Sequence, residues 1–194
     1  MPEPEPSRLL KMLCYPLRHE PWQFGLELTD EGFSSLEALV KVVCLRLHGF
    51  SEEPAEPVKQ TICQLDPERF EVRGEGSDAL IRARYGHSFP VPRLGEVAAP
   101  PEVLYHGTSE ESAVMIKKNG LLPVDRYFLH LTTDRDYAVR VGTAKGRVFL
   151  WQVNAGEAFA EGIAFRRATP HVWLTSHVPA RFLVAKPMNP SDTV

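Results

Sequence analysis

The chain has 194 residues, of which 43% are hydrophobic and 24% charged, and its formal net charge is −3 at pH 7. This composition is ordinary for a globular protein, and the length suffices for one domain or for two of about 100 residues, each with its own core. Residues 1–99 hold 16 acidic and 11 basic side chains. That balance excludes a basic field over this half, so nucleic acid would have to bind at a local basic patch.

Cysteine spacing and apolar runs indicate the compartment. Cys14, Cys44 and Cys63 form no CxxC pair, which argues against a zinc site or a disulfide framework and for a reducing environment. No run approaches 18 apolar residues, and the Pro/Glu-rich residues 1–6 lack the pattern of a signal peptide. We therefore expect a cytoplasmic protein with no membrane segment and no bound metal.

The first half of the chain predicts helices followed by a hairpin. After a disordered tail over residues 1–6, leucines at helical spacing predict a helix that Ser7 caps and that Pro16 bends or ends. Residues 26–28 alternate as a short strand, and residues 29–32 form a turn.

A second helix, capped by Ser34 or Ser35, should run to about Gly49, and the pattern indicates a third over residues 57–65. Residues 70–73 and 80–84, separated by a Gly/Ser/Asp turn, predict a β-hairpin. Three helices and a hairpin in this order are typical of a winged-helix domain.

The second half predicts an α+β unit with short strands. Four prolines over residues 88–101 mark a boundary. A strand from Val103 should precede a helix over 110–119 that Asn119 and Gly120 close. A second strand over 128–133 leads to a helix that Asp134 caps and Gly142 ends, and three β-like runs follow at 148–153, 158–165 and 172–175.

Two strands of this half end in site-like residues. His106, Gly107 and Thr108 follow an apolar run, and His130 and Thr132 lie in a second one. A glycine without a Cβ would let a ligand approach the backbone, and the ring and hydroxyl beside it offer polar contacts. A single histidine on a strand is more often a hydrogen-bonded core or surface residue. The interpretation as a ligand site therefore depends on both strands facing the same ligand.

Basic side chains lie at two places in the first half. Arg18 and His19 stand at the end of the first helix, where they are either a solvated helix end or a phosphate clamp. Arg82 and Arg84 lie two apart on one strand and so share a face, suited to a nucleic-acid backbone or simply to an exposed strand edge.

Together these segments resemble the NAD-dependent RNA 2′-phosphotransferases, which act on tRNA-type 2′-phosphates. The resemblance extends, in order, from about Ser7 to about Leu183. Its motifs are Leu17-Arg18-His19-Glu20-Pro21, Gly25-Leu26 to Gly32-Phe33, Ile81-Arg82-Ala83-Arg84-Tyr85-Gly86-His87-Ser88, Leu104-Tyr105-His106-Gly107-Thr108, Leu129-His130-Leu131-Thr132, Val172-Trp173-Leu174 and Val178-Pro179.

The resemblance implies an α+β protein with two lobes. A winged-helix RNA-binding lobe would occupy residues 7–88, a linker 89–101, an ADP-ribosyltransferase-like NAD-binding lobe 102–187 and a tail 188–194. His106, Gly107, Thr108, His130, Thr132 and Val172 would hold NAD as co-substrate, and Arg84, His87 and Ser88 would contact RNA.

The implied reaction moves an internal 2′-phosphate of RNA to NAD. The phosphate attacks NAD and releases nicotinamide, which gives an ADP-ribosylated RNA. A ribose hydroxyl of the attached ADP-ribose then attacks phosphorus. The products are RNA with a 2′-hydroxyl and ADP-ribose 1″,2″-cyclic phosphate. Arg18, His19 and Arg82 would neutralise the phosphate charge, and we expect a monomer.

One family position departs from the pattern. A further arginine is expected in a Val-Gly-x-Arg-x-Gly pattern, and this chain has Ala144 there. Lys145, Arg140 or Arg147 could substitute, although lysine lacks the bidentate fork of arginine. The residues 168–171 also depart from the Asn-Gly that is frequent in the family.

The sequence leaves two other functions open. One is an ADP-ribosyltransferase that modifies a nucleic-acid 5′-phosphate or another acceptor with the same NAD lobe. The other is a non-catalytic winged-helix protein whose second lobe senses NAD or ADP-ribose.

Overall fold

A computed structural model describes residues 6–48, 66–144 and 146–186. The chain divides into two compact units, Met1–Leu94 and Gly95–Val194. The helix indicated over 57–65, the tail at 188–194, Lys145 and all but the last residue of the tail at 1–6 lie outside the described residues.

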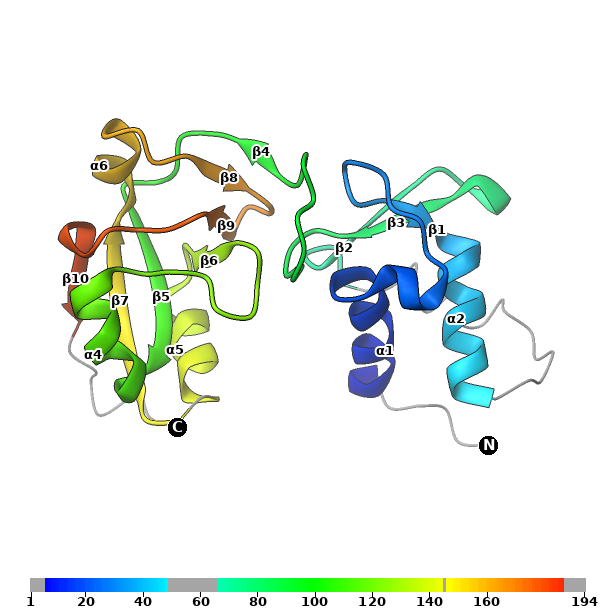
Figure 1. Cartoon of the computed structure of the whole chain (residues 1–194), viewed down its shortest axis with the longest axis horizontal. Helices are drawn as coiled ribbons and strands as arrows, with labels where there is room; N and C mark the ends of the chain where they lie inside the picture. Colours follow the sequence, from blue (N-terminus) through cyan, green and yellow to red (C-terminus); the bar gives the residue numbers. More distant parts are fainter. Residues whose placement is uncertain (1–5, 49–65, 145, 187–194) are drawn as a thin grey trace. The chain divides into compact units, whose positions relative to one another are not determined.

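The first unit combines two described α-helices with a small sheet (Figure 1). Its elements are α1 (Pro6–Arg18), η1 (Pro21–Phe24), β1 (Ser34–Ser35), α2 (Leu36–His48), β2 (Phe70–Arg73), η2 (Gly76–Asp78) and β3 (Leu80–Ala83). Helix α1 begins at Pro6, so the expected cap Ser7 lies inside it. Pro16 does not end α1, which continues to Arg18. Ser35 caps α2, because its Oγ accepts a hydrogen bond from the Ala38 backbone N–H at 3.2 Å.

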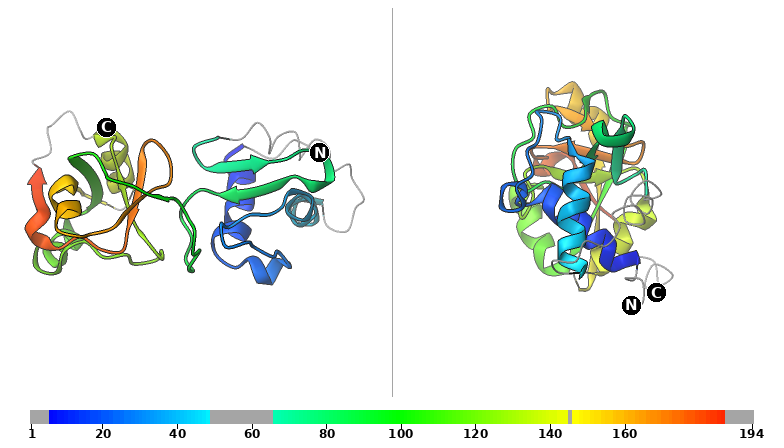
Figure 2. Two further views of the ribbon diagram at one scale, coloured as in Figure 1. Left: turned by 90° about the horizontal axis from the view of Figure 1, so that it is seen from above. Right: turned by 90° about the vertical axis from the view of Figure 1, so that its right-hand side faces the viewer.

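The sheet of this unit has the strand order β1-β3-β2, and both pairings are antiparallel. The predicted hairpin is confirmed, with Phe70 opposite Ala83. Residues 26–28 form no strand: Leu26 is buried in the core without joining a ladder. Helix α1 packs against α2 and β3 (Figure 2), and the leucines that face inward close a core with Ile81 of β3.

The second unit is built on a seven-stranded antiparallel sheet. Its elements are β4 (Glu96–Val97), β5 (Val103–Ser109), α4 (Glu110–Asn119), β6 (Leu129–Thr132), α5 (Arg135–Thr143), β7 (Val148–Asn154), α6 (Ala155–Ala160), β8 (Phe165–Arg167), β9 (Val172–Thr175), η3 (Ala180–Phe182) and β10 (Leu183–Lys186). The strand order is β10-β7-β5-β6-β9-β8-β4. Strand β4 lies within residues 89–101, the expected linker, and pairs with β8.

Helices α4 and α5 pack on opposite faces of the central strands (Figure 1). Leu104 of β5 shares a core cluster with Ala113 of α4, and its neighbour Tyr105 packs against the α5 cluster, as strand alternation requires. The helix predicted over 110–119 is confirmed, with Ser109 as its cap and Gly120 at its C-cap with φ +80°. Helix α5 passes through Gly142 and ends at Thr143.

The run at 158–165 was predicted wrongly as a strand. Residues 155–160 form the short helix α6, and a strand begins only at Phe165. Both units nevertheless combine helices with antiparallel sheets, so the expected α+β class is confirmed at this level. Among the residues described, no helix is both long and apolar enough to cross a bilayer.

Candidate functional site

The end of α1 is joined to the segment that follows β3. The backbone N–H of Ser88 donates to the Arg18 carbonyl oxygen at 2.9 Å, which satisfies one of the carbonyls that a helix end leaves without an intrahelical partner. This bond brings Arg18, His19 and Ser88 together although 70 residues separate the bonded pair.

The Arg18 side chain is buried, and the described residues satisfy only part of its guanidinium. The residue is only 9% exposed, and its guanidinium lies over the Tyr85 ring, 5.1 Å from the centroid. Its Nε and Nη2 atoms are buried and have no hydrogen-bond partner in the described part of the chain. A buried donor without a partner costs about 1–3 kcal/mol, and more when it is charged. Oxygens of a bound phosphate would satisfy both nitrogens in the bidentate geometry that arginine favours.

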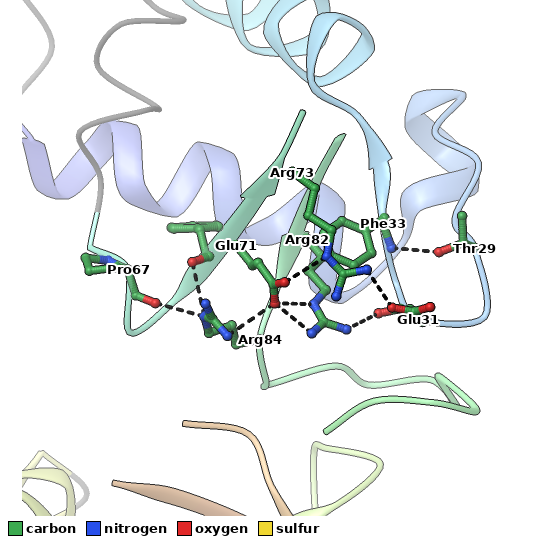
Figure 3. Close-up of polar contacts among 9 residues, drawn as sticks. Thr29, Glu31, Phe33, Pro67, Glu71, Arg73, Arg82 and Arg84 are labelled. Atoms are coloured by element: carbon green, nitrogen blue, oxygen red, sulfur yellow. Dashed lines mark hydrogen bonds and ion pairs between the residues drawn. The ribbon is translucent and has the colours of Figure 1, made fainter. Parts of the chain in front are cut away.

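Arg82 is held in one orientation by its neighbours (Figure 3). Its Nε and Nη2 donate to Glu71 Oε2 at 3.0 and 2.7 Å, and its Nη1 donates to the Glu31 carbonyl at 2.9 Å. The predicted turn before Phe33 presents that carbonyl, since Gly32 N–H bonds to Thr29 O at 2.8 Å. The Arg82 guanidinium also lies 4.5 Å from the Phe33 ring centroid. These contacts leave two of the five guanidinium N–H groups for a ligand.

The Glu71 carboxylate contacts three arginines. Besides Arg82, it accepts from Arg73 at 2.9 Å and lies 3.2 Å from Arg84. Burial alone would raise the pKa of the Glu71 carboxyl, but the hydrogen bonds and charges of Arg82, Arg73 and Arg84 outweigh it, so the pKa falls below its ordinary value. With Glu31 paired to Arg73, the cluster holds three positive and two negative charges, and the surplus is positive.

The other residues predicted to contact RNA differ in accessibility. Arg84 is half-buried, and its Nε donates hydrogen bonds to the carbonyl oxygens of Pro67 and Phe70, which stabilises the hairpin. His87 is only 3% exposed and packs beside Phe89. Ser88 is exposed. The structure therefore gives His87 a place behind the surface that Ser88 presents.

In the second unit, the two predicted histidines lie on adjacent strands. His106 Nδ1 is 2.9 Å from the His130 carbonyl oxygen. Because a carbonyl only accepts, Nδ1 carries a proton and donates to it. Strands β5 and β6 share one register pair, Tyr105 with Thr132, whereas β5 pairs with β7 over its whole length. The ladder between the two histidine strands is therefore limited to that pair.

The remaining predicted NAD-binding residues lie on the same central strands. Thr132 is opposite Tyr105 on one side and Val172 on the other, so these three form a row across β5, β6 and β9. Thr108 and Val172 are buried. Trp151, opposite His106 in the β5–β7 ladder, keeps a buried indole Nε1 that no described group accepts from.

Gly107 is required by packing. A Cβ at this position would lie 1.7 Å from the Ala138 carbonyl oxygen of α5, far inside contact distance. The space that the missing side chain leaves is therefore filled by α5 and not by a ligand. Any ligand contact of Gly107 must use its backbone groups.

The position of the expected further arginine lies at the end of α5. Ala144 is exposed and forms the C-cap of the helix. Two of the possible substitutes point to carboxylates: Arg140 lies 4.0 Å from Asp134, and Arg147 lies 3.1 Å from Glu110. Both are largely exposed.

Sequence reasoning missed Glu71 and the aromatic residues near His19. No pattern marks a glutamate that three arginines share, although the hairpin register, had it been known, would have placed Glu71 opposite Arg82. Across residues 6–48, 66–144 and 146–186, no three His, Cys, Asp or Glu side chains are grouped to hold a metal ion.

Comparison with known proteins identifies the family. The family model described as RNA 2′-phosphotransferase, Tpt1/KptA family, matches residues 5–177. The chain is similar to a probable RNA 2′-phosphotransferase of Acetivibrio thermocellus, 38% identical over 91% of this chain and 95% of that protein. A protein of the same description from Streptomyces coelicolor is 37% identical over 91% of this chain and 93% of its own length. The chain belongs to the RNA 2′-phosphotransferase family.

Proposed function

We propose that this protein is a transferase that moves an internal 2′-phosphate of RNA to NAD. One observation carries the proposal: in a member of this family, Arg18 is buried, and two of its guanidinium nitrogens have no acceptor among the residues that the structure describes. A phosphate is the ligand that satisfies both the charge and the donor geometry.

The first unit would bind RNA. Arg18, His19 and Arg82 would contact the 2′-phosphate, and the fixed orientation of Arg82 reduces the entropy lost on binding. The β2–β3 hairpin beside α1 and α2 is compatible with a winged-helix lobe. Ser88 would contact the RNA, and Arg84 and His87 would support that surface from within.

The second unit would bind NAD in an ADP-ribosyltransferase-like fold. His106, whose ring bonds to the His130 carbonyl oxygen, and the buried indole N–H of Trp151, which no described group accepts from, would offer polar contacts to a dinucleotide. His130, Thr108, Thr132, Val172 and the backbone of Gly107 complete the proposed set. NAD supplies an anomeric carbon with nicotinamide as the leaving group.

The chemistry would need charge neutralisation more than a base. A 2′-phosphate oxygen attacks the anomeric carbon and nicotinamide leaves, which gives ADP-ribosylated RNA. The 2″-hydroxyl of the attached ADP-ribose then attacks phosphorus, and the RNA 2′-oxygen leaves and takes up the proton of that hydroxyl. The products are RNA with a 2′-hydroxyl and ADP-ribose 1″,2″-cyclic phosphate. The second transition state spreads negative charge over the phosphate oxygens, which is the demand that Arg18, His19 and Arg82 would meet.

Ala144 should slow the second step. An alanine offers no donor to the phosphate oxygens, and the nearby Arg140 and Arg147 lie beside the carboxylates of Asp134 and Glu110. We therefore expect ADP-ribosylated RNA to accumulate. The protein would act as a monomer in the cytoplasm.

The test is incubation of the purified protein with NAD and a short RNA that carries one internal 2′-phosphate, with RNA species and nicotinamide followed over time. Early nicotinamide release with a transient modified RNA is the expected result. Rapid conversion to 2′-hydroxyl RNA would support the transferase and refute the slow second step. Absence of nicotinamide release would refute the transferase and leave the non-catalytic NAD-sensing function. Release only with a 5′-phosphate acceptor would favour the ADP-ribosyltransferase alternative.

A further inference from the structure

An open hollow of about 440 Å³ lies in the first unit beside the end of α1. That volume is within the roughly 300–1,000 Å³ of small-ligand sites. Its walls come from the end of α1, from η1 and from the segment after β3, and they consist of Tyr15, His19, Glu20, Trp22, Ser88 and Phe89. Half of these side chains are the aromatic residues Tyr, Trp and Phe.

The aromatic wall is exposed and fixed in place. Trp22 is 61% exposed, and its ring packs edge-on against Phe89 with 5.4 Å between centroids. The short helix η1 that carries it starts at the buried Pro21 and ends at Phe24, and Gly25 caps it in the left-handed conformation. Phe89 in turn rests against the buried His87, with 5.5 Å between centroids. A large apolar ring held rigidly at the surface is typical of a stacking platform for bases.

The hollow adjoins the proposed phosphate site. His19 and Ser88 line it, and Ser88 is bonded to the backbone of Arg18 at 2.9 Å. His19, which we propose to contact the 2′-phosphate, lines the hollow together with Trp22, so a nucleotide whose phosphate contacted His19 would bring a neighbouring base close to Trp22.

Glu20 indicates which part of a nucleotide fits. Its carboxylate accepts the Tyr15 hydroxyl hydrogen bond at 2.9 Å and contributes a negative charge to the wall. A second phosphate would be repelled there, whereas a neutral base carrying N–H donors would be accepted.

We propose that this hollow is a nucleobase subsite, in which a base adjacent to the 2′-phosphorylated nucleotide stacks on Trp22. The proposal rests on the proposed function, because RNA must be the substrate. It adds that recognition extends beyond the phosphate to a neighbouring base, and that Trp22 is the residue that binds it.

The test compares two sets of short 2′-phosphorylated RNAs. One set is intact, and the other lacks the base of the 5′ or the 3′ neighbour of the phosphorylated nucleotide. Base stacking contributes about 1–3 kcal/mol, so the wild type should prefer intact RNA by roughly 5- to 150-fold in kcat/KM for nicotinamide release. Trp22→Ala should abolish that preference and leave the rate on the abasic RNA unchanged. Trp22→Phe should retain most of the preference.

Leu45→Ala, at a 53% exposed position of α2, is the matched control and should behave as wild type. Equal activity of the wild type on intact and abasic RNA would overturn the subsite, as would an equal loss on both substrates in Trp22→Ala. If neither substrate releases nicotinamide, the transferase fails, and fluorescence anisotropy with the same labelled RNAs decides the subsite. A wild-type preference in affinity that Trp22→Ala removes would support it, and identical affinities would refute it.

Discussion

Replacing Glu71 by glutamine tests whether one carboxylate holds the arginine cluster. Oε2 of Glu71 accepts two hydrogen bonds from Arg82, and its side chain is only 18% exposed. Charge-assisted hydrogen bonds each contribute about 1.5–3 kcal/mol to stability. Arg73 and Arg84 are partly exposed, so solvent screens their attraction to Glu71. We expect Glu71→Gln to lower the free energy of unfolding of the first unit by about 2 kcal/mol. For a unit of this size, that loss lowers the melting temperature by roughly 10 °C.

The cost should depend on pH with a defined sign. The pKa of Glu71 is lowered in the folded protein, so the ionised carboxylate stabilises the fold above the unfolded pKa of about 4.3. That stabilisation is lost as the pH falls through the folded pKa. The difference between wild type and Glu71→Gln should therefore be full at pH 7 and shrink below about pH 4.

Hydrogen exchange of β2 and β3 peptides at both pH values is the suitable assay, because it reports on the hairpin separately from the second unit. Glu75→Gln, at an exposed position of the same hairpin, should leave exchange unchanged at either pH. A protection loss that is the same at pH 7 and at pH 3.5 would refute the charge argument, and no loss at pH 7 would refute the role of Glu71 altogether.

Three further substitutions test separate parts of the reasoning. Gly107→Ala should destabilise the second unit by about 3 kcal/mol or prevent folding, because the new Cβ meets the Ala138 carbonyl. Gly156→Ala, which meets only a flexible carboxylate, should cost less, and equal melting temperatures would contradict this ranking. Arg18→Lys should lower nicotinamide release about 100-fold with a similar melting temperature, since lysine lacks the bidentate fork; wild-type activity would dismiss the anion site. Ala144→Arg should shorten the lifetime of modified RNA in a time course, and an unchanged lifetime would remove the proposed defect.

Several elements could be predicted because their signals are local. The helix over Glu110–Asn119 has a serine cap, a helical apolar spacing and a glycine at its end, all within a dozen residues. The hairpin over Phe70–Arg73 and Leu80–Ala83 is also local, because a short turn joins its strands. By contrast, α6 has only six residues, too few for helical periodicity to differ from strand alternation. Strand β10 pairs with β7, about 30 residues earlier in the chain, and four residues carry no signal of that.

The site residues divide in the same way. Arg18 and Arg82 could be singled out from residue type and from the family resemblance. The burial of Arg18 depends on Tyr85 and Ser88, and the orientation of Arg82 depends on Glu71. These partners become neighbours only once the chain has folded, so no local pattern identifies them.

The bond between Ser88 and Arg18 also bears on when RNA-binding competence arises during synthesis. Arg18 leaves the ribosome 70 residues ahead of Ser88. At that stage Ser88 and Phe89, which line the hollow, and Tyr85, whose ring contacts Arg18, have not yet been synthesised. Contacts of such long sequence separation form late in folding. An incomplete nascent chain would therefore present Arg18 as an ordinary exposed arginine, and the phosphate contact proposed for it would form only when the whole first unit has been translated and has folded.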